Sequence, residues 1–181
     1  MKVQSNVTND KSADWGYKKP EDGWHVVEMG EGIDAMKDGE GKLVKDKKDN
    51  QLWKFPAKIN EEGSESHGLD VSIVLAETGF GEKKIADIIS AIGQADNFEK
   101  AFPGDRSFFE SAIMDKIKIK LPGQFCKMRT ELSKDGKYSN VMEIASLKFK
   151  PEDVVKGKAD KKGAKKEAAA SEPAKESGGD W

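Results

Sequence analysis

The chain has 181 residues, with 31 Lys and Arg, 33 Asp and Glu, and a formal net charge of -2. One cysteine and two histidines exclude an internal disulfide framework, a cysteine-based zinc cluster and most histidine-dependent metal sites. No apolar run approaches the ~18 residues of a membrane span, and the Met1 end lacks the apolar segment of a secretory signal. The composition therefore predicts a soluble cytoplasmic protein without a metal or another cofactor.

The apolar residues are distributed unevenly along the chain. Leu, Ile, Val and Phe account for 36 of the 181 residues, and none of them occurs in residues 156–181. A segment that lacks these residues cannot bury enough surface to offset the entropy of folding. We therefore predict a polar N-terminal arm (1–21), one folded domain (22–150) and a disordered tail rich in Lys, Ala and Glu (151–181).

Five segments of the predicted domain have the composition of β-strands. They are rich in β-branched and aromatic residues, and several alternate between apolar and polar positions. Pro56 cannot donate a hydrogen bond to a neighbouring strand, so we expect the second strand to lie at an edge or to contain a bulge. A long charged loop joins the first two strands. The predicted strands are 23–29, 51–59, 69–75, 124–132 and 138–149.

Between the third and fourth strands the pattern changes to that of helices. Ile85, Ile88, Ile89 and Ile92 recur at the spacing of one face of an amphipathic helix. Gly93 follows as a C-terminal cap. The phenylalanine-rich residues beyond it continue an α-helical section up to the fourth strand.

The last two strands form a hairpin whose register depends on the length of the turn. Both a two-residue turn and a five-residue connection fit the sequence. The five-residue connection pairs Leu132 with Tyr138 and Met128 with Met142, and it gathers the apolar residues on one face, so we favour it. Gly136 then takes the positive-φ position. The opposite face carries Phe125, Lys127, Arg129 and Glu131.

Motifs for catalysis are weak in this sequence. A dinucleotide-type glycine pattern begins at Gly30, but the residues after it lack the apolar period of the required helix. His25 falls in a strand and His67 in a polar loop, and Cys126 falls on the apolar face of its strand. We therefore predict no catalytic residues and no enzyme activity.

One strand face has the spacing of a platform for single-stranded nucleic acid. Such a platform needs cations that contact phosphates and flat rings that receive bases. Phe125, Lys127 and Arg129 alternate on one face, and the lysine-rich loop and the last turn would border the groove. Residues 1–155 carry 24 basic and 28 acidic side chains, so any positive groove must be local. An ordinary solvated sheet face is the other interpretation.

Four segments, in this order, resemble phage-type single-stranded-DNA-binding proteins built on an OB-fold. They are the strand Gly23-Trp-His-Val-Val-Glu, the Lys-rich loop leading to Gln51-Leu-Trp-Lys-Phe55, the helix Ile85–Ile92, and the hairpin Leu121-Pro-Gly-Gln-Phe-Cys-Lys…Met142-Glu-Ile144. The resemblance implies a barrel of about five strands and a role in DNA replication, recombination or repair.

The end of the chain adds to this resemblance. Many such proteins end in a flexible linker and an acidic, aromatic tip that recruits replication or recombination proteins. Asp180 and Trp181 are similar to that tip and are the expected partner-binding residues. The lysine-rich tail before them departs from the family pattern.

The sequence as a whole thus predicts a mainly β protein: an OB-fold-like five-stranded barrel with an inserted α-helical section and a disordered tail. Its predicted function is non-enzymatic binding of single-stranded DNA by base stacking and phosphate contacts. A protein-binding adaptor or a virion-associated β-domain that does not bind DNA is the alternative, and no convincing carboxylate cluster supports a hydrolase or nuclease accessory with a metal site. The oligomeric state is open, and a dimer is allowed. The predicted nucleic-acid-binding residues are Lys42, Lys45, Lys47, Lys48, Trp53, Lys54, Phe125, Lys127, Arg129, Lys134, Lys137 and Tyr138.

Overall fold

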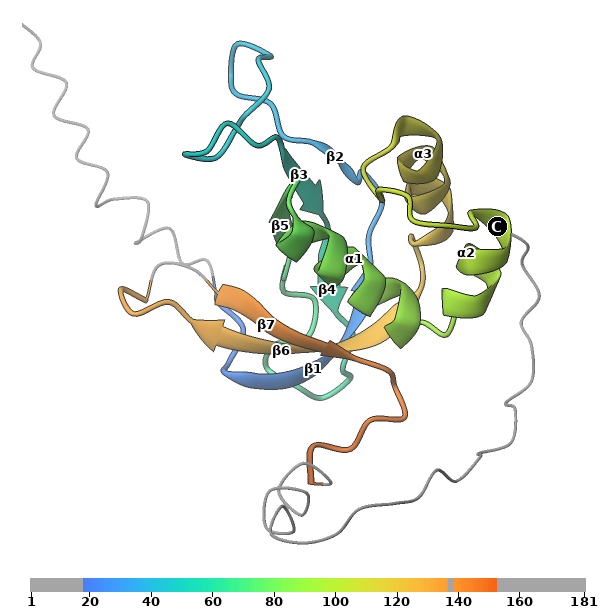
Figure 1. Ribbon diagram of the computed structural model, residues 1–181. Helices are drawn as coiled ribbons and strands as arrows, with labels where there is room; N and C mark the ends of the chain where they lie inside the picture. Colours follow the sequence, from blue (N-terminus) through green and yellow to red (C-terminus); the bar gives the residue numbers. More distant parts are fainter. Residues whose placement is uncertain (1–17, 137–138, 153–181) are drawn as a thin grey trace, which may run out of the picture.

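A computed structural model describes residues 18–136 and 139–152 (Figure 1). Within these residues the protein is mainly β, as predicted. The predicted α-helical section consists of three helices between Ala76 and Phe125. The elements are β1 (Gly23–Met29), β2 (Asp34–Ala35), β3 (Leu52–Phe55), β4 (Ala57–Ile59), β5 (Ile73–Ala76), α1 (Gly79–Ala91), α2 (Ala95–Ala101), α3 (Ser111–Lys120), β6 (Phe125–Leu132) and β7 (Ser139–Ala145).

The strands form two antiparallel sheets, and the chain passes from one sheet to the other several times. One sheet has the order β4-β1-β6-β7 and the other has the order β2-β3-β5. The predicted second strand breaks at Pro56 into β3 and β4, which lie in different sheets. Proline cannot donate a ladder hydrogen bond, so this break is where the strand changes sheets. Within the described residues β5 and β7 are not paired, so the sheets do not close there, and the predicted OB-fold-like five-stranded barrel is not confirmed.

Helix α1 lies between β5 and β7 and packs against both (Figure 1). Its buried residues include Ile85, Ile88 and Ile89, which confirms the predicted apolar stripe. Gly93 has a φ of 75°, and the next amide, from Gln94, donates to the carbonyl of Ile89 at 3.0 Å. This is the glycine C-cap that the sequence predicts.

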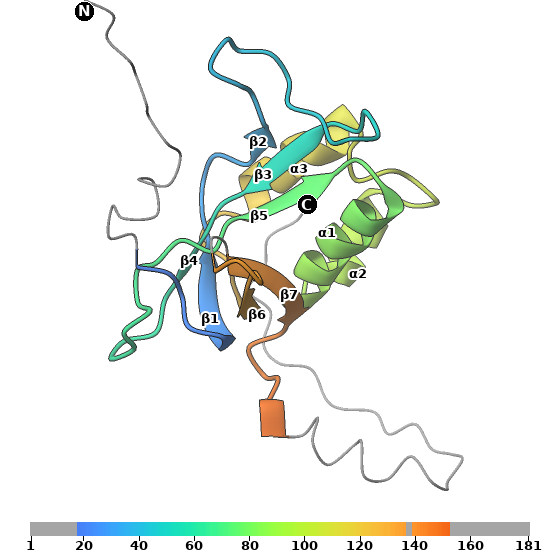
Figure 2. The ribbon, with the colours of Figure 1, turned by 90° about the vertical axis from the view of Figure 1, so that its left-hand side faces the viewer.

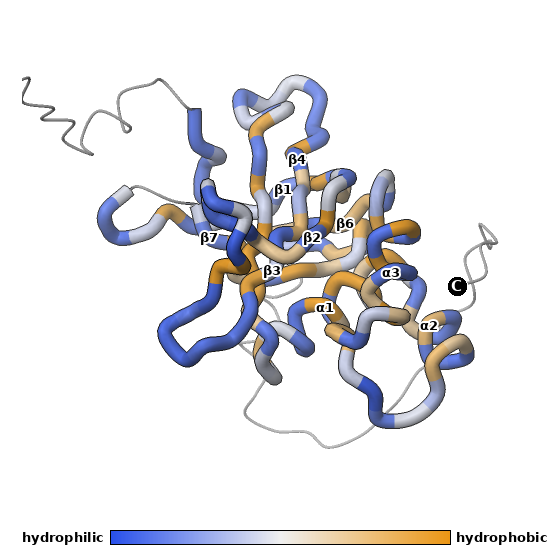
Figure 3. Tube along the Cα trace, turned by 90° about the horizontal axis from the view of Figure 1, so that it is seen from above, coloured by the Kyte–Doolittle hydropathy of each residue, from blue (hydrophilic) through white to orange (hydrophobic). Residues whose placement is uncertain are grey.

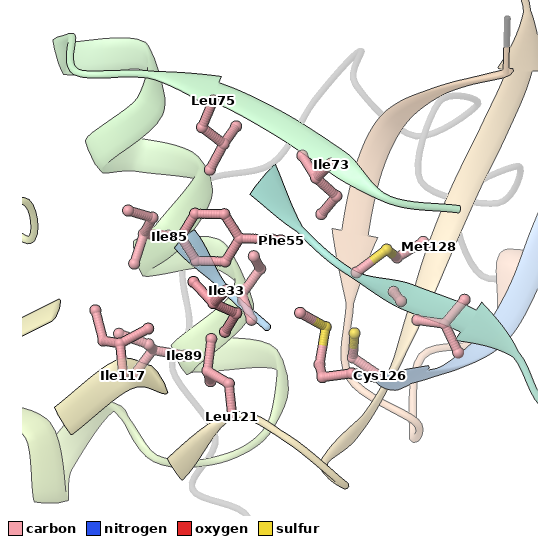
Figure 4. Close-up of a cluster of buried hydrophobic side chains, with 14 of the residues drawn as sticks. Ile33, Phe55, Ile73, Leu75, Ile85, Ile89, Ile117, Leu121, Cys126 and Met128 are labelled. Atoms are coloured by element: carbon pink, nitrogen blue, oxygen red, sulfur yellow. The ribbon is translucent and has the colours of Figure 1, made fainter. Parts of the chain in front are cut away.

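The core lies between the two sheets and helices α1 and α3. Figure 4 shows Phe55 of β3 among the aliphatic side chains Ile33, Leu75 and Ile85. Cys126 is fully buried in the same cluster, as predicted. Other fully buried side chains are Met29, Ile59, Ile88, Ile113, Met114, Ile117, Leu121 and Met128.

The predicted register of the last hairpin is wrong. Met128 pairs with Ile144 instead of Met142, and a β-bulge interrupts the ladder beside Arg129. The bulge has a physical reason, since Val141 and Ile144 both pack against the core although they stand three positions apart. Strict alternation would direct one of them to solvent, and one extra residue in β7 resolves the conflict. The turn does place its glycine, Gly136, at positive φ (66°).

Candidate nucleic-acid interface

The lysine-rich loop between β2 and β3 (residues 36–51) contains two consecutive turns of the same design. Asp38 donates its amide to the carbonyl of Lys42 at 2.9 Å, and its carboxylate accepts from the amides of Glu40 and Lys42. Eight residues later, Asp46 makes the equivalent backbone hydrogen bond to Asn50 at 2.9 Å, and its carboxylate accepts from the Asn50 amide. Side-chain and backbone hydrogen bonds from Asn50 lower the pKa of Asp46. Each turn is therefore ordered by its own aspartate.

The bases of the two turns meet in a ring of three backbone hydrogen bonds. Met36 donates to Leu52 at 2.8 Å, Leu52 donates to Val44 at 3.0 Å, and Val44 donates to Met36 at 2.8 Å. The side chain of Gln51 lies against this ring. Its Nε2 donates to the same three carbonyl oxygens, at 3.4 Å (Met36), 3.1 Å (Val44) and 2.8 Å (Leu52). Gln51 is only 9% exposed, so a buried amide holds the two turns together as one unit.

The lysines of this loop differ in how their charges are balanced. Lys42 forms an ion pair with Glu40 at 2.9 Å, and Lys45 forms one with Asp49 at 3.0 Å. Four further lysines are exposed and form no ion pair with any other described residue. They are Lys37 at the start of the loop, Lys47 and Lys48 in the second turn, and Lys54 on the outer face of β3. Figure 3 shows the loop as mostly hydrophilic, with hydrophobic residues where it joins β3.

The outer face of β6 carries the predicted residues, but both of its cations have partners within the protein. Phe125, Lys127 and Arg129 lie on the face opposite the buried side chains, as predicted. The guanidinium of Arg129 forms ion pairs with Glu131 and, at 2.7 Å, with Glu143. Two carboxylates therefore neutralise the charge of Arg129, which makes its guanidinium a poor ligand for a phosphate.

The segment that follows β7 covers part of the same face. The ring centroids of Trp24 and Phe149 lie 4.5 Å apart, and Lys127 Nζ donates to the carbonyl oxygen of Phe149 at 2.7 Å. The predicted last strand thus ends at Ala145, before the chain crosses the sheet. Phe125 remains 37% exposed at the edge of this covered face.

Trp53 has a structural environment at the rim of the core. It is partly buried, its Nε1 donates to Glu77 at 2.8 Å, and its ring centroid lies 6.2 Å from that of Phe109. Lys118 of α3 lies 5.4 Å from the ring centroid and 3.3 Å from Asp34. Of the remaining predicted residues, Lys134 is exposed in the β6–β7 turn. Lys137, Tyr138, Asp180 and Trp181 lie outside the described residues.

Sequence reasoning missed one aromatic residue. Phe80, in the first turn of α1, is 68% exposed, more than any other aromatic side chain in the described part of the chain. Lys84 lies one turn later, with Nζ 5.6 Å from the centroid of the ring. The sequence indicates the exposure of Phe80 only through its position in the helix. Phe80 stands outside the apolar stripe and between two glycines.

Other chemistry finds little support in the described ranges. His25 is buried, with Nε2 donating to the carbonyl of Glu21 at 2.8 Å and Nδ1 3.3 Å from Glu61, which is a structural arrangement. No group of three or more His, Cys, Asp or Glu side chains there could hold a metal ion. None of the helices there has both the length and the apolar composition needed to cross a membrane.

Comparison with models of known protein families gave no match, and a search of curated proteins found none with significant similarity to this chain.

Proposed function

We propose that this protein binds single-stranded DNA without sequence choice, in phage-type replication, recombination or repair. The observation that carries the proposal is a group of exposed lysines that form no ion pair within the described residues, Lys47, Lys48 and Lys54, on an ordered loop and the adjoining strand. Cations that lack internal partners exchange water and counterions for phosphates at little cost. The loop is fixed by Gln51, so little conformational entropy is lost when phosphates bind.

The order of the strands supports an OB-like arrangement. If β1 and β2 are taken as one strand, and β3 and β4 as another, the order across the molecule is β5, β3/β4, β1/β2, β6, β7. An OB barrel binds nucleic acid on its second and third strands, beside the loops that join the first to the second and the fourth to the fifth. Here those strands are β3/β4 and β5. The loop that joins the first strand to the second is the lysine-rich, or lysine-bearing, loop at residues 36–51. We propose an OB-like barrel in which α1 fills the gap between the third and fifth strands.

The proposed surface differs from the one that the sequence favours. The loop at residues 36–51 and Lys54 keep their predicted role. The outer face of β6 loses it, because Arg129 and Lys127 are bound within the protein and Phe149 covers Trp24. The binding surface therefore runs along the loop and the outer face of β3 and β5.

A competition titration separates this function from the adaptor alternative. Binding of a fluorescein-labelled oligo-dT is followed by anisotropy, with unlabelled single strands and duplexes of equal length as competitors. We expect the single strand to compete much better than the duplex, because stacking needs unpaired bases. Equal competition by the two, or no binding at all, would reject the proposal and favour a protein-binding role.

A further inference from the structure

We propose that Phe80 and Lys84 form a contact site for one nucleotide of the DNA strand, in which the phenyl ring stacks on one unpaired base and the ammonium contacts the neighbouring phosphate. This inference rests on the proposed function and adds a contact site outside the loop. It comes from three properties of the first turn of α1: its rigid attachment, its exposed aromatic ring and its connection to the lysine-bearing loop.

The backbone that carries Phe80 is held in place on both sides. Thr78 caps the helix, since its Oγ1 accepts from the amide of Gly81 at 3.3 Å and its carbonyl accepts from Glu82 at 2.9 Å. A Cβ added to Gly81 would lie 2.1 Å from the carbonyl oxygen of Ala76, so the helix begins in close contact with the end of β5. A ring mounted on such a turn loses little entropy when it stacks.

The ring points away from the core and lies beside a cation. The buried positions of α1 are Gly81, Ile85, Ile88 and Ile89, and Phe80 is not part of the core cluster. Lys84 Nζ donates to the carbonyl of Met142 in β7 at 2.7 Å, and this contact fixes the ammonium 5.6 Å from the ring centroid. An ammonium has three donors, so others remain for a phosphate.

The helix start is joined to the lysine-bearing loop. The amide of Glu77 donates to the carbonyl of Gln51 at 3.0 Å, at the base of that loop. Figure 2 shows α1 beginning beyond the end of β5, on the same side of the molecule as the loop. Through this junction the backbone of Phe80 is connected to the loop that carries Lys47 and Lys48, and both lie on the proposed path of one DNA strand.

The chemistry of the site favours a base as the occupant. A stable protein interface buries about 800 Å² on each partner around a more apolar centre. Phe80 offers one isolated ring next to an ammonium, which matches one base and one phosphate. An exposed ring paired with a cation is also a recurrent arrangement in single-strand binding grooves.

The test compares Phe80→Ala and Phe80→Leu on oligo-dT and on an oligonucleotide of the same length with abasic sites. Both variants should weaken binding to oligo-dT by about 5- to 150-fold, the range expected for one stacked base. Leucine keeps an apolar side chain without a π-face, so its failure to restore affinity identifies stacking. On the abasic oligonucleotide, the variants and the wild type should bind alike. Unchanged far-UV circular dichroism verifies the fold.

Two results would overturn the inference. Wild-type affinity of Phe80→Ala for oligo-dT would remove Phe80 from the site while leaving the proposed function intact. Loss of self-association in sedimentation, without a change in DNA affinity, would assign the ring to a contact between two copies of the chain. If the wild type itself fails to bind oligo-dT, the proposed function and this inference fall together.

Discussion

Arg129 lies on the strand face that the sequence predicts, yet its surroundings give it another role. Two carboxylates, Glu131 and Glu143, bind its guanidinium on the surface of the first sheet. The type of a residue and the face of the strand on which it lies can be predicted from the sequence. The cross-strand partner of Arg129 depends on the register beyond a β-bulge, and no local pattern predicts that bulge.

Substitution of Arg129 by Gln tests this interpretation. Affinity for oligo-dT should change by less than about twofold, because the guanidinium is already bound within the protein. Stability should fall by about 1 kcal/mol or less, as expected for ion pairs that remain partly exposed. Anisotropy and thermal unfolding measure the two effects. A tenfold loss of affinity with an unchanged melting temperature would return Arg129 to the DNA-binding surface.

Cys126 provides a pH-dependent prediction at the same scale. Burial raises the pKa of its thiol from the ordinary value of 9.0 to about 12. The folded state therefore favours the neutral thiol, and this contribution to stability is complete below pH 9 and lost progressively as the pH rises from 9 to 12. The difference in unfolding free energy between the wild type and Cys126→Ala should shrink as the pH rises above 9. A thiol reagent at pH 8 should react only after denaturant is added. Rapid reaction without denaturant would contradict the burial of this thiol.

At the scale of elements, the start of α1 depends on one glycine. Gly81→Ala places a Cβ 2.1 Å from a backbone oxygen, so the helix and β5 must separate. We expect a loss of about 1–3 kcal/mol in unfolding free energy. Gly79→Ala is the matched control, because nothing lies within 4 Å of its Cβ and alanine favours helix. Chemical denaturation of both variants measures the difference. Equal stability of the two would show that the close approach is not required.

The ring at the base of the lysine-bearing loop gives a second prediction for an element. Gln51→Met removes the donor to three carbonyl oxygens, which we expect to cost about 1–3 kcal/mol. Hydrogen exchange at the amides of Met36, Val44 and Leu52 should accelerate together. In the comparison variant, Asp46→Ala, exchange should accelerate only within the second turn. Independent changes at the three ring amides would show that they do not form one cooperative unit.

The sequence predicts elements better than it predicts how they meet. The stripe on α1 and the inward position of Cys126 follow from local periodicity, and both are confirmed. Backbone chemistry at Pro56 predicts an edge position or a bulge, whereas the structure breaks the strand there into β3 and β4. The gap between β5 and β7 and the crossing of Phe149 over Trp24 are long-range arrangements. They arise from packing between segments far apart in the chain, which periodicity does not record.

The candidate site was predicted only in part for the same reason. A run of lysines identifies the loop, but the ion pairs that separate Lys45 from Lys47 depend on the fold of the second turn. Phe80 gave only the weak signal of an aromatic residue outside an apolar stripe. Its exposure follows from the side on which α1 packs against β5 and β7.

At the scale of the whole molecule, the proposed binding surface requires a local excess of cations on a net acidic chain. Residues 1–155 carry 24 basic and 28 acidic side chains. Many acids have partners, as Glu131 and Glu143 do with Arg129, whereas Lys47 and Lys48 form no ion pair with any described residue. At ordinary salt a surface charge acts over only about 8–10 Å, so local balance decides binding.

The most direct measurement of the central claim is the salt dependence of oligo-dT affinity for wild type and for the variant with Lys47, Lys48 and Lys54 all replaced by Ala. Each phosphate contact with a single strand contributes about 0.7 to the log–log slope, so the variant's slope should be shallower by about 2. The control replaces Lys100, Lys148 and Lys150, three exposed lysines away from this surface, and should keep the wild-type slope. A slope unchanged in the first variant, or equally reduced in both, would contradict phosphate binding at this loop.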